Sequence, residues 1–493
     1  MSKYTVYGEK IDDFIEKYYL QKIVSSFLKD VEAMNNKLIS VILFGGFGKG
    51  EGSIQFINKK PIPYNDFDFY IITEKKLDDK ELNKISMNAS KEIGVEGLEI
   101  AYFPEQEYDS KKFFHIDVRC IPYNKLSKLM KTQRYYELKY RSKIIYGDKT
   151  VLDRIPQIKP EEIPLSEGLR NLLNKLHTML LGLNKEYNKE QEKIKIFWGY
   201  KCYLSICEAL LILDKKFAPN YVERANLFIN NYKKSFPNLH EKIPNLPEKI
   251  RRATRFKLKL DFNVNHEKLF DLALKDILIV FEYYLKKFSD NDKNDDNAEN
   301  GWDKIQVENN EIENIINNKL PYIYFKPYLN ERLGFNFFVS QYLLNISYFN
   351  VLRKKEEIYF KPLFNWKDVG LRLILPIYYL LKAYQEGKQE IKQDMVLDSN
   401  QVIQKPQTNQ TTRSNKEIIT DLKNFNLTTN NLTSINPNYN NYKDSIINSE
   451  YLDKTYNELK NIIKIDEKNK NNFWYLREKA LKAYGLYYQQ RLL

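Results

Sequence analysis

The chain has 493 residues, of which 43% are hydrophobic, and a formal net charge of +13. This length exceeds one ordinary core, so two or more domains are expected, and the apolar content excludes a wholly disordered chain. Three cysteines without a CxxC pair exclude a disulfide scaffold, and the presence of only four histidines argues against a structural zinc site. The charge fits an anionic partner such as a nucleotide or nucleic acid, or simply a solvated lysine-rich surface.

The first residues, MSKYTVYGEKIDDFIEKYY, contain neither a long apolar core nor a cleavage signal. The late apolar run LRLILPIYYLL is too short to span a bilayer. We therefore expect a cytoplasmic protein that has no membrane partner.

Residues 1–150 mix helix and strand signals. Apolar residues recur at helical spacing from Ile11 to Met34, and a buried strand is expected over 38–44. A hairpin or long loop is expected in IQFINKKPIPY, and a helix over 75–94. Further strands are expected in three segments: DFDFYIIT (66–73), GLEIAYFP (97–104) and FFHIDVRCIP (113–122).

A glycine-rich segment, LFGGFGKGEGS (43–53), ends the first buried strand. Glycine costs conformational entropy, so such a cluster indicates either close approach of the backbone to a bound group or a loose surface loop. Asp66 and Asp68 stand two apart in a strand pattern, which puts both carboxylates on one face. Neighbouring carboxylates repel each other, and a divalent cation bound also by substrate phosphates relieves that repulsion. The pattern predicts a triphosphate cradled by the glycines, with its metal on the aspartates. The alternative is a turn followed by an exposed strand edge.

The segment is neither a Walker A loop nor a G-x-G-x-x-G loop. Phe44-Gly45-Gly46 followed by Asp66-Phe67-Asp68 resembles instead the DNA polymerase β-like nucleotidyltransferase superfamily. The resemblance covers about the first 120 to 150 residues. It implies an α+β fold, in which a catalytic domain with a mixed sheet and flanking helices precedes helical domains. Positions 47–65 form a longer gap than the family usually has, which a hairpin could absorb, and Gly46 replaces a serine that often touches phosphate.

The resemblance also implies a third carboxylate on a neighbouring strand. Asp117 is the expected residue, because a bounded apolar strand presents it; Glu99, Glu105 and Glu107 are the competitors. Asp117 would bind the catalytic metal or accept the proton of the attacking hydroxyl. The simpler interpretation is an ion pair with Arg119 or a nearby lysine.

The cofactors that the resemblance implies are Mg²⁺ or Mn²⁺ and an NTP, with ATP expected. Gly45, Gly46 and Lys49 are the expected nucleotide contacts in the glycine segment, whereas Gly52, at its far end, is expected to matter less. Lys201, on an otherwise apolar helix, could reach the β- and γ-phosphates or could snorkel to the surface.

The helical remainder offers weaker candidates. Tyr221 and Arg224 could contact the nucleotide or the acceptor, whereas His177 is expected to be a satisfied core histidine, and Cys202 and Cys207 small buried hydrophobes. The basic, aromatic C-terminal helix is expected to dock on the protein's own core, with nucleic acid or a partner as alternatives. The expected organisation is a catalytic domain (1–150), a helical domain closing the cleft (151–288), an acidic spacer (289–301), a second helical block (302–386), an Asn-rich disordered linker (387–450) and a C-terminal helical segment (451–493).

These features favour a metal-dependent nucleotidyltransferase that moves a nucleoside monophosphate, with AMP expected, onto a hydroxyl of a small-molecule acceptor and releases pyrophosphate. One alternative is the same chemistry on RNA, or in making oligonucleotides. Another is a non-catalytic, antitoxin-like binding module, against which the intact Asp66 and Asp68 pair argues.

Overall fold

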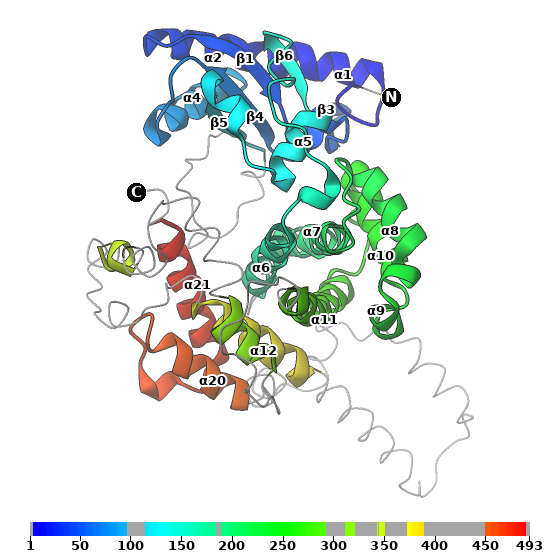
Figure 1. The fold of residues 1–493 in the computed structure, drawn as a ribbon, viewed down its shortest axis with the longest axis vertical. Helices are drawn as coiled ribbons and strands as arrows, with labels where there is room; N and C mark the ends of the chain where they lie inside the picture. The colour runs from blue at the N-terminus through cyan, green and yellow to red at the C-terminus, as the bar shows by residue number, and fades with distance from the viewer. Residues whose placement is uncertain are drawn as a thin grey trace, which may run out of the picture.

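The computed structural model describes residues 3–95, 114–183, 189–291, 311–320, 343, 345–350, 372–388 and 449–489. Figure 1 shows a sheet with flanking helices, coloured blue to cyan, above a mass of helices coloured green to red. The expected α+β fold, with a mixed sheet followed by a helical region, is confirmed.

The main sheet of the described residues has the strand order β5-β4-β1-β6. Its strands are β1 (Leu38–Leu43), β4 (Phe67–Thr73), β5 (Ile116–Pro122) and β6 (Lys143–Gly147). β1 runs antiparallel to β4 and β6, whereas β4 and β5 are parallel. The end of β1 and the starts of β4 and β5 therefore meet at one edge of the sheet.

Helices cover both faces of this sheet. α2 and α4 pack on one face with Phe67, Phe69 and Ile71, and α5 lies on the other with Tyr70 and Ile72. The alternation expected in DFDFYIIT thus turns Asp68 toward the α5 side. The helices are α1 (Glu9–Ile15), a π-helical turn (Glu16–Leu20), α2 (Gln21–Ala33), α4 (Asp79–Glu92) and α5 (Gln133–Arg141).

The gap between the glycines and the aspartates is filled by a short helix and a hairpin. α3 (Gly45–Lys49) follows β1, and β2 (Ile54–Ile57) pairs with β3 (Lys60–Pro63). Asn58 and Lys59 take φ values of 50° and 64° in the hairpin turn, as a tight two-residue hairpin loop demands. The hairpin interpretation is confirmed, while the strand expected over 97–104 lies outside the described residues.

The helical region is built around α7, which contacts α6, α8, α10 and α11. Its described elements are α6 (Leu165–Leu181), α7 (Lys189–Leu213), α8 (Tyr221–Ser235), α9 (Pro237–Lys242), α10 (Leu246–Leu258), α11 (His266–Asn291), α12 (Glu311–Asn314), a π-helical turn (Ile315–Lys319), a helix over 374–388, α20 (Ser449–Leu459) and α21 (Phe473–Gln489). Short 3₁₀ turns occupy Tyr123–Lys128, Pro160–Glu162 and Glu467–Asn469.

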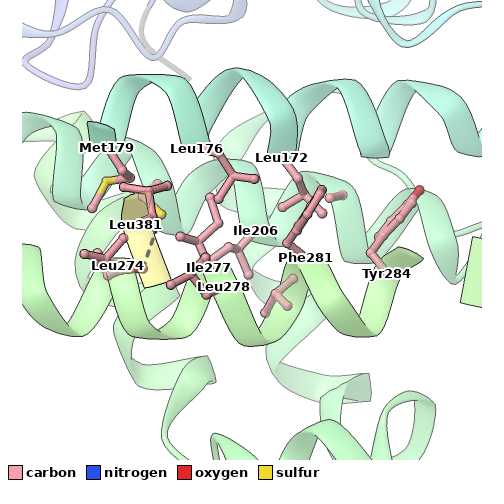
Figure 2. Packing of buried hydrophobic residues seen from close by; sticks show 14 of the residues in the cluster. Leu172, Leu176, Met179, Ile206, Leu274, Ile277, Leu278, Phe281, Tyr284 and Leu381 are labelled. Carbon is pink, nitrogen blue, oxygen red and sulfur yellow. Dashed lines mark hydrogen bonds between the residues drawn. The ribbon is translucent and has the colours of Figure 1, made fainter. Parts of the chain in front are cut away.

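Leucines and aromatics at helical spacing form the core of this region. Figure 2 shows Leu176 and Leu172 of α6 directed toward Ile277 and Phe281 of α11. Met179 of α6 lies beside Leu381 and Leu274. The same apolar cluster continues through the helix over 374–388 into α20 and α21. The described helices on both sides of the 389–448 segment, which lies outside the described residues, therefore share one core.

The C-terminal helix docks on the protein itself, as expected. The guanidinium of Arg477 donates to the carbonyl oxygens of Leu180 (3.1 Å) and Leu181 (2.9 Å). Tyr484 stacks on His177 with ring centroids 3.7 Å apart. His177 is buried, but its Nε2 has no hydrogen-bond partner among the described residues, so it is not the satisfied histidine expected. Burial, with Lys175 and Arg477 nearby, lowers the pKa of His177 to about 3.

Two expected boundaries shift slightly. α11 continues to Asn291, into the expected acidic spacer, of which 292–301 lie outside the described residues. Lys388 pairs with Asp271 (2.9 Å) and Glu267 (3.3 Å), so the start of the expected linker belongs to the helical core.

One helix in the described ranges, Gln191–Leu213, is long and apolar enough to cross a membrane by length and composition. Its most apolar window is 78% buried inside the protein. Buried core helices have the same property, so this helix is weak evidence for a membrane.

Cys202 and Cys207 lie on the helix Gln191–Leu213 and are buried as expected, and burial raises the pKa of each thiol.

Candidate active site

Two of the three expected carboxylates face each other across adjacent strands. Asp68 of β4 and Asp117 of β5 are register partners, and Asp66 precedes Asp68 by two residues. All three lie at the sheet edge where β1 delivers the glycine segment, because the backbone N–H of Phe44 donates to the carbonyl oxygen of Asp68 (2.8 Å). Glu99, Glu105 and Glu107, the competing third carboxylates, lie outside the described residues.

The Asp68 carboxyl is buried close to the other two carboxylates. Burial raises the pKa of its carboxyl well above the usual range, and the charges of Asp66 and Asp117 raise it further. Arg134 and Arg119 oppose this shift. Arg119 lies 3.6 Å from Asp117, so the ion pair suggested as the simpler interpretation of Asp117 is present, but both side chains are substantially exposed. Such a pair contributes little to stability.

Arg134 is a neighbour of this site that the sequence did not reveal. It comes from α5, hydrogen-bonds Tyr70, and acts electrostatically on Asp68 and Asp117. Nothing in its local sequence, TQRYYELKYR, marks it as different from an arginine on the surface of any helix. Only the packing of α5 on the sheet brings it to the carboxylates.

The carboxylates suit a hard cation in their chemistry. Among the described residues, no three His, Cys, Asp or Glu side chains converge closely enough to form a ready metal cluster. Mg²⁺, however, is commonly held by one or two carboxylates together with substrate phosphates. Asp66 and Asp68, with Asp117 beside them, therefore fit that cation as oxygen donors that a nucleotide would complete.

Gly45 is shaped by its contact with Asp68. Its φ is +62°, and a Cβ built on it would lie 1.9 Å from Oδ2 of Asp68. Residues with a side chain avoid this backbone region, and here the space for one is also filled. The glycine thus lets the backbone lie directly against the carboxylate.

Gly46 and Gly52 differ in the space around them. A Cβ on Gly46 would meet the flexible end of Lys257, at 3.1 Å from Nζ. A Cβ on Gly52 would lie 2.3 Å from the ring of Phe47, which is buried. A side chain at Gly52 would therefore disturb the packing of Phe47, while the smaller importance of Gly52 for nucleotide binding stays a prediction.

Lys257 of α10 lies against the glycine segment. Its side chain is buried, its Nζ donates to Oγ of Ser53 (3.1 Å), and the Ser53 hydroxyl donates to its carbonyl oxygen (2.7 Å). Burial and then repulsion by Lys201 lower the pKa of Lys257 to about 8, against the attraction of Asp66 and Glu51. Lys201 itself is half-buried, with its ammonium 4.4 Å from the Phe197 ring centre. Lys257 therefore lies against the glycine segment, and Lys201 is its electrostatic neighbour.

Lys49 and Arg224 have structural partners where nucleotide contacts were expected. Lys49 Nζ pairs with Glu137 (2.7 Å), and both side chains are buried. Glu137 also pairs with Arg224, which is 1% exposed and pairs further with Glu208. Buried charges of this kind must be paired, and here the carboxylates of Glu137 and Glu208 neutralise the two cations. Tyr221 lies beside it, with its ring centre 4.9 Å from Lys49 Nζ.

Replacing Glu137 with Gln is expected to destabilise the fold by about 3–5 kcal/mol, because the substitution leaves two buried cations on a neutral amide. Burial alone would raise the pKa of Glu137, but Arg224 and Lys49 hold it below the usual range. Its contribution is therefore present at neutral pH and is lost as the pH falls. Chemical unfolding measures the change. Glu162→Gln, which breaks an exposed pair with Lys131, is the matched control and should leave the unfolding free energy nearly unchanged.

A separate cavity of about 330 Å³ lies between α7, α10 and α11. It is lined by Tyr200, Tyr203, Asn245, Glu248, Lys249, Arg252, Val264, Asn265, Lys268, Leu269 and Leu272. None of the carboxylates or glycines described above lines it, so it is not part of the candidate active site.

No protein-family model matches the chain, and no curated protein matches it. Among solved structures, the chain is similar to the spectinomycin adenyltransferase AAD(9) from Enterococcus faecialis, crystallised with ATP and spectinomycin. The similarity has 15% sequence identity and a TM-score of 0.31, and covers 55% of this chain and 98% of that one. At these values it assigns neither a substrate nor a reaction to this chain.

Proposed function

We propose that this protein is a metal-dependent nucleotidyltransferase of the polymerase β-like kind. It transfers a nucleoside monophosphate from an NTP to a hydroxyl of a small-molecule acceptor and releases pyrophosphate. We expect the nucleotide to be AMP, with ATP as its donor. The observation that supports this most is the meeting of Asp68 and Asp117 at the sheet edge where Gly45 lies against Asp68. The proposal places the enzyme in the cytoplasm, where NTPs are abundant.

In this proposal Asp66 and Asp68 hold Mg²⁺ or Mn²⁺. The metal, when bound, lowers the pKa of the acceptor hydroxyl and stabilises negative charge on the phosphates. Asp117, next to Asp68, shares the metal or accepts the proton of the attacking hydroxyl. The repulsion that raises the pKa of Asp68 is the force that a bound cation would relieve.

The helical region supplies the positive charge for the triphosphate. Lys257 lies against Gly46, and Lys201 lies close enough to Lys257 to act on it electrostatically. A Lys ammonium acts on phosphate as a compact point charge. Most of the catalytic effect then comes from positioning and electrostatics, since little covalent chemistry is asked of the protein.

The test is incubation of the purified protein with each labelled NTP and Mg²⁺ or Mn²⁺, with pyrophosphate release as the readout. One arm adds a small-molecule extract of cells and another adds RNA. Label transferred to a small molecule supports the proposal. Label on RNA would replace the acceptor class, and no pyrophosphate in any arm with a folded protein would refute transferase activity.

Lys257→Met is expected to weaken Mg²⁺–ATP binding by about tenfold or more, the equivalent of one or more charge-assisted hydrogen bonds. It should not destabilise the fold. The depressed pKa of Lys257 means that the charged form is disfavoured in the folded state, at a cost that is fully present below about pH 8 and declines as the pH rises toward the ordinary pKa of 10.5. Titration calorimetry gives the affinity, and thermal melting gives the stability.

The wild-type affinity should also fall as the pH rises through the pKa of Lys257, whereas the variant should lose this dependence. Lys259→Met is the matched control, because Lys259 is exposed and lies two residues after Lys257, just past the end of α10. This variant should bind Mg²⁺–ATP like the parent. Equal affinity of Lys257→Met and the parent would remove Lys257 from the nucleotide site.

A further inference from the structure

Glu51 joins the glycine segment to the first turn of α8. Its carboxylate accepts the backbone N–H of Tyr221 at 2.9 Å and that of Val222 at 3.0 Å. Its own backbone N–H donates to the carbonyl oxygen of Gly46 at 2.8 Å. One buried residue, 6% exposed, therefore contacts Gly46 through its backbone and a helix of the other region through its side chain.

This contact is strong for a physical reason. The first N–H groups of a helix have no partner within the helix, and they form its positive end. Asn220 caps α8 by accepting the N–H of Glu223 (2.8 Å), and Glu51 accepts the two N–H groups before it. A carboxylate that accepts two N–H groups away from water makes charge-assisted hydrogen bonds.

The segment is held at further points. Ser53 is bonded to Lys257 in both directions, and the N–H of Gly52 donates to the carbonyl oxygen of Tyr4 (3.0 Å). The glycine segment thus lies between the N-terminal part and the helical region, fixed to each. Within it, Glu51 is the residue whose bonds reach both Gly46 and α8.

We propose that Glu51 is a positioning residue that couples the phosphate-binding backbone at Gly46 to the first turn of α8. The inference rests on the proposed function, because it assumes that an NTP lies against the glycine segment. Binding of the nucleotide fixes Gly46, Gly46 fixes Glu51, and Glu51 holds the α8 amides. By linkage, a well-capped α8 also favours nucleotide binding by the same factor.

The test compares Glu51→Gln with Glu81→Gln. The amide that replaces the Glu51 carboxylate offers only one oxygen, so one of the two α8 bonds is lost together with the charge. Glu81 is a carboxylate cap within α4, where its Oε2 accepts the N–H of Asp78 (2.7 Å). It caps its own helix within the N-terminal part, so it matches the chemistry but not the position.

Glu51→Gln is expected to weaken binding of a non-hydrolysable ATP analogue with Mg²⁺ by roughly tenfold, the effect of losing a hydrogen bond to a charged group. Glu81→Gln should bind like the parent. Val222→Pro removes one of the two bonds from the helix side, because proline has no N–H and is tolerated in the first turn, and it should weaken binding as Glu51→Gln does. Val222→Ala is its control, since this side chain is 40% exposed.

Hydrogen exchange supplies the readout that a merely structural role would not move. In the parent and in Glu81→Gln, the nucleotide analogue should slow exchange of the Tyr221 and Val222 amides; in Glu51→Gln it should not. If both Glu51→Gln and Val222→Pro bind the nucleotide as the parent does, the inference is overturned and the proposed function stands. The same holds if bound nucleotide does not change the exchange rate of the α8 amides in the parent. Failure of the parent to bind any NTP would overturn both.

Discussion

Replacing Asp68 with Asn is expected to reduce nucleotide transfer about a thousandfold or more, because a carboxylate that holds the metal contributes several kcal/mol to the transition state. The substitution keeps the size and shape of the side chain. It changes the charge at the point where Asp66 and Asp117 already crowd the site. Single-turnover transfer of a labelled nucleotide measures the loss.

The same substitution is expected to preserve or raise stability. The raised pKa of Asp68 means that the folded state holds its proton more tightly than the unfolded chain does. The carboxylate therefore costs stability once the pH exceeds its ordinary value, and a neutral amide removes that cost at pH 7. Loss of activity together with an unchanged or higher melting temperature is the expected signature.

Metal dependence separates this result from simple misfolding. Mg²⁺ with a nucleotide should raise the melting temperature of the parent and not that of Asp68→Asn, since a ligand stabilises only the state it binds. Asp13→Asn, at an exposed position of α1, should behave like the parent in every assay. Retention of near-normal transfer by Asp68→Asn would remove the carboxylates from the mechanism.

The parts of the site that local patterns control could be predicted. The alternation of DFDFYIIT put Asp68 and Phe69 on opposite faces, and the turn chemistry of the preceding segment gave the hairpin. In the structure, the antiparallel pairing of β1 with β4 brings the glycines to the aspartates. Periodicity and turn chemistry are enough for the strand faces and the hairpin, because both depend on neighbours a few residues apart.

The parts that depend on long-range packing could not be predicted. Lys257 meets Ser53 across 204 positions, and Glu51 meets Tyr221 across 170. Lys49 was expected at the nucleotide because it stands in the glycine segment, but Glu137, 88 positions away, pairs with it. A single sequence gives no sign of such partners, since each is one charged residue among many.

Gly45→Ala is expected to reduce nucleotide transfer by about a hundredfold or more, because it displaces a catalytic carboxylate without removing it. The new methyl group would occupy the place of Oδ2 of Asp68, so the Asp68 side chain must move. The positive φ of Gly45 adds about 1–2 kcal/mol of backbone strain for any residue with a Cβ. A lower melting temperature should therefore accompany the loss, in contrast to Asp68→Asn.

Gly46→Ala is the matched control, and it separates two explanations of the glycines. Its methyl group would meet the end of the Lys257 side chain, which can shift, and would lie at an ordinary contact distance of 3.4 Å from the Glu51 carbonyl oxygen. An effect below about tenfold is therefore expected if the carboxylate contact is what matters. A larger loss in Gly46→Ala than in Gly45→Ala, seen as weaker Mg²⁺–ATP binding by calorimetry, would contradict this. A side chain at Gly46 would then disturb nucleotide binding more than the displacement of Asp68 does, and the contact of Gly45 with Asp68 would be secondary.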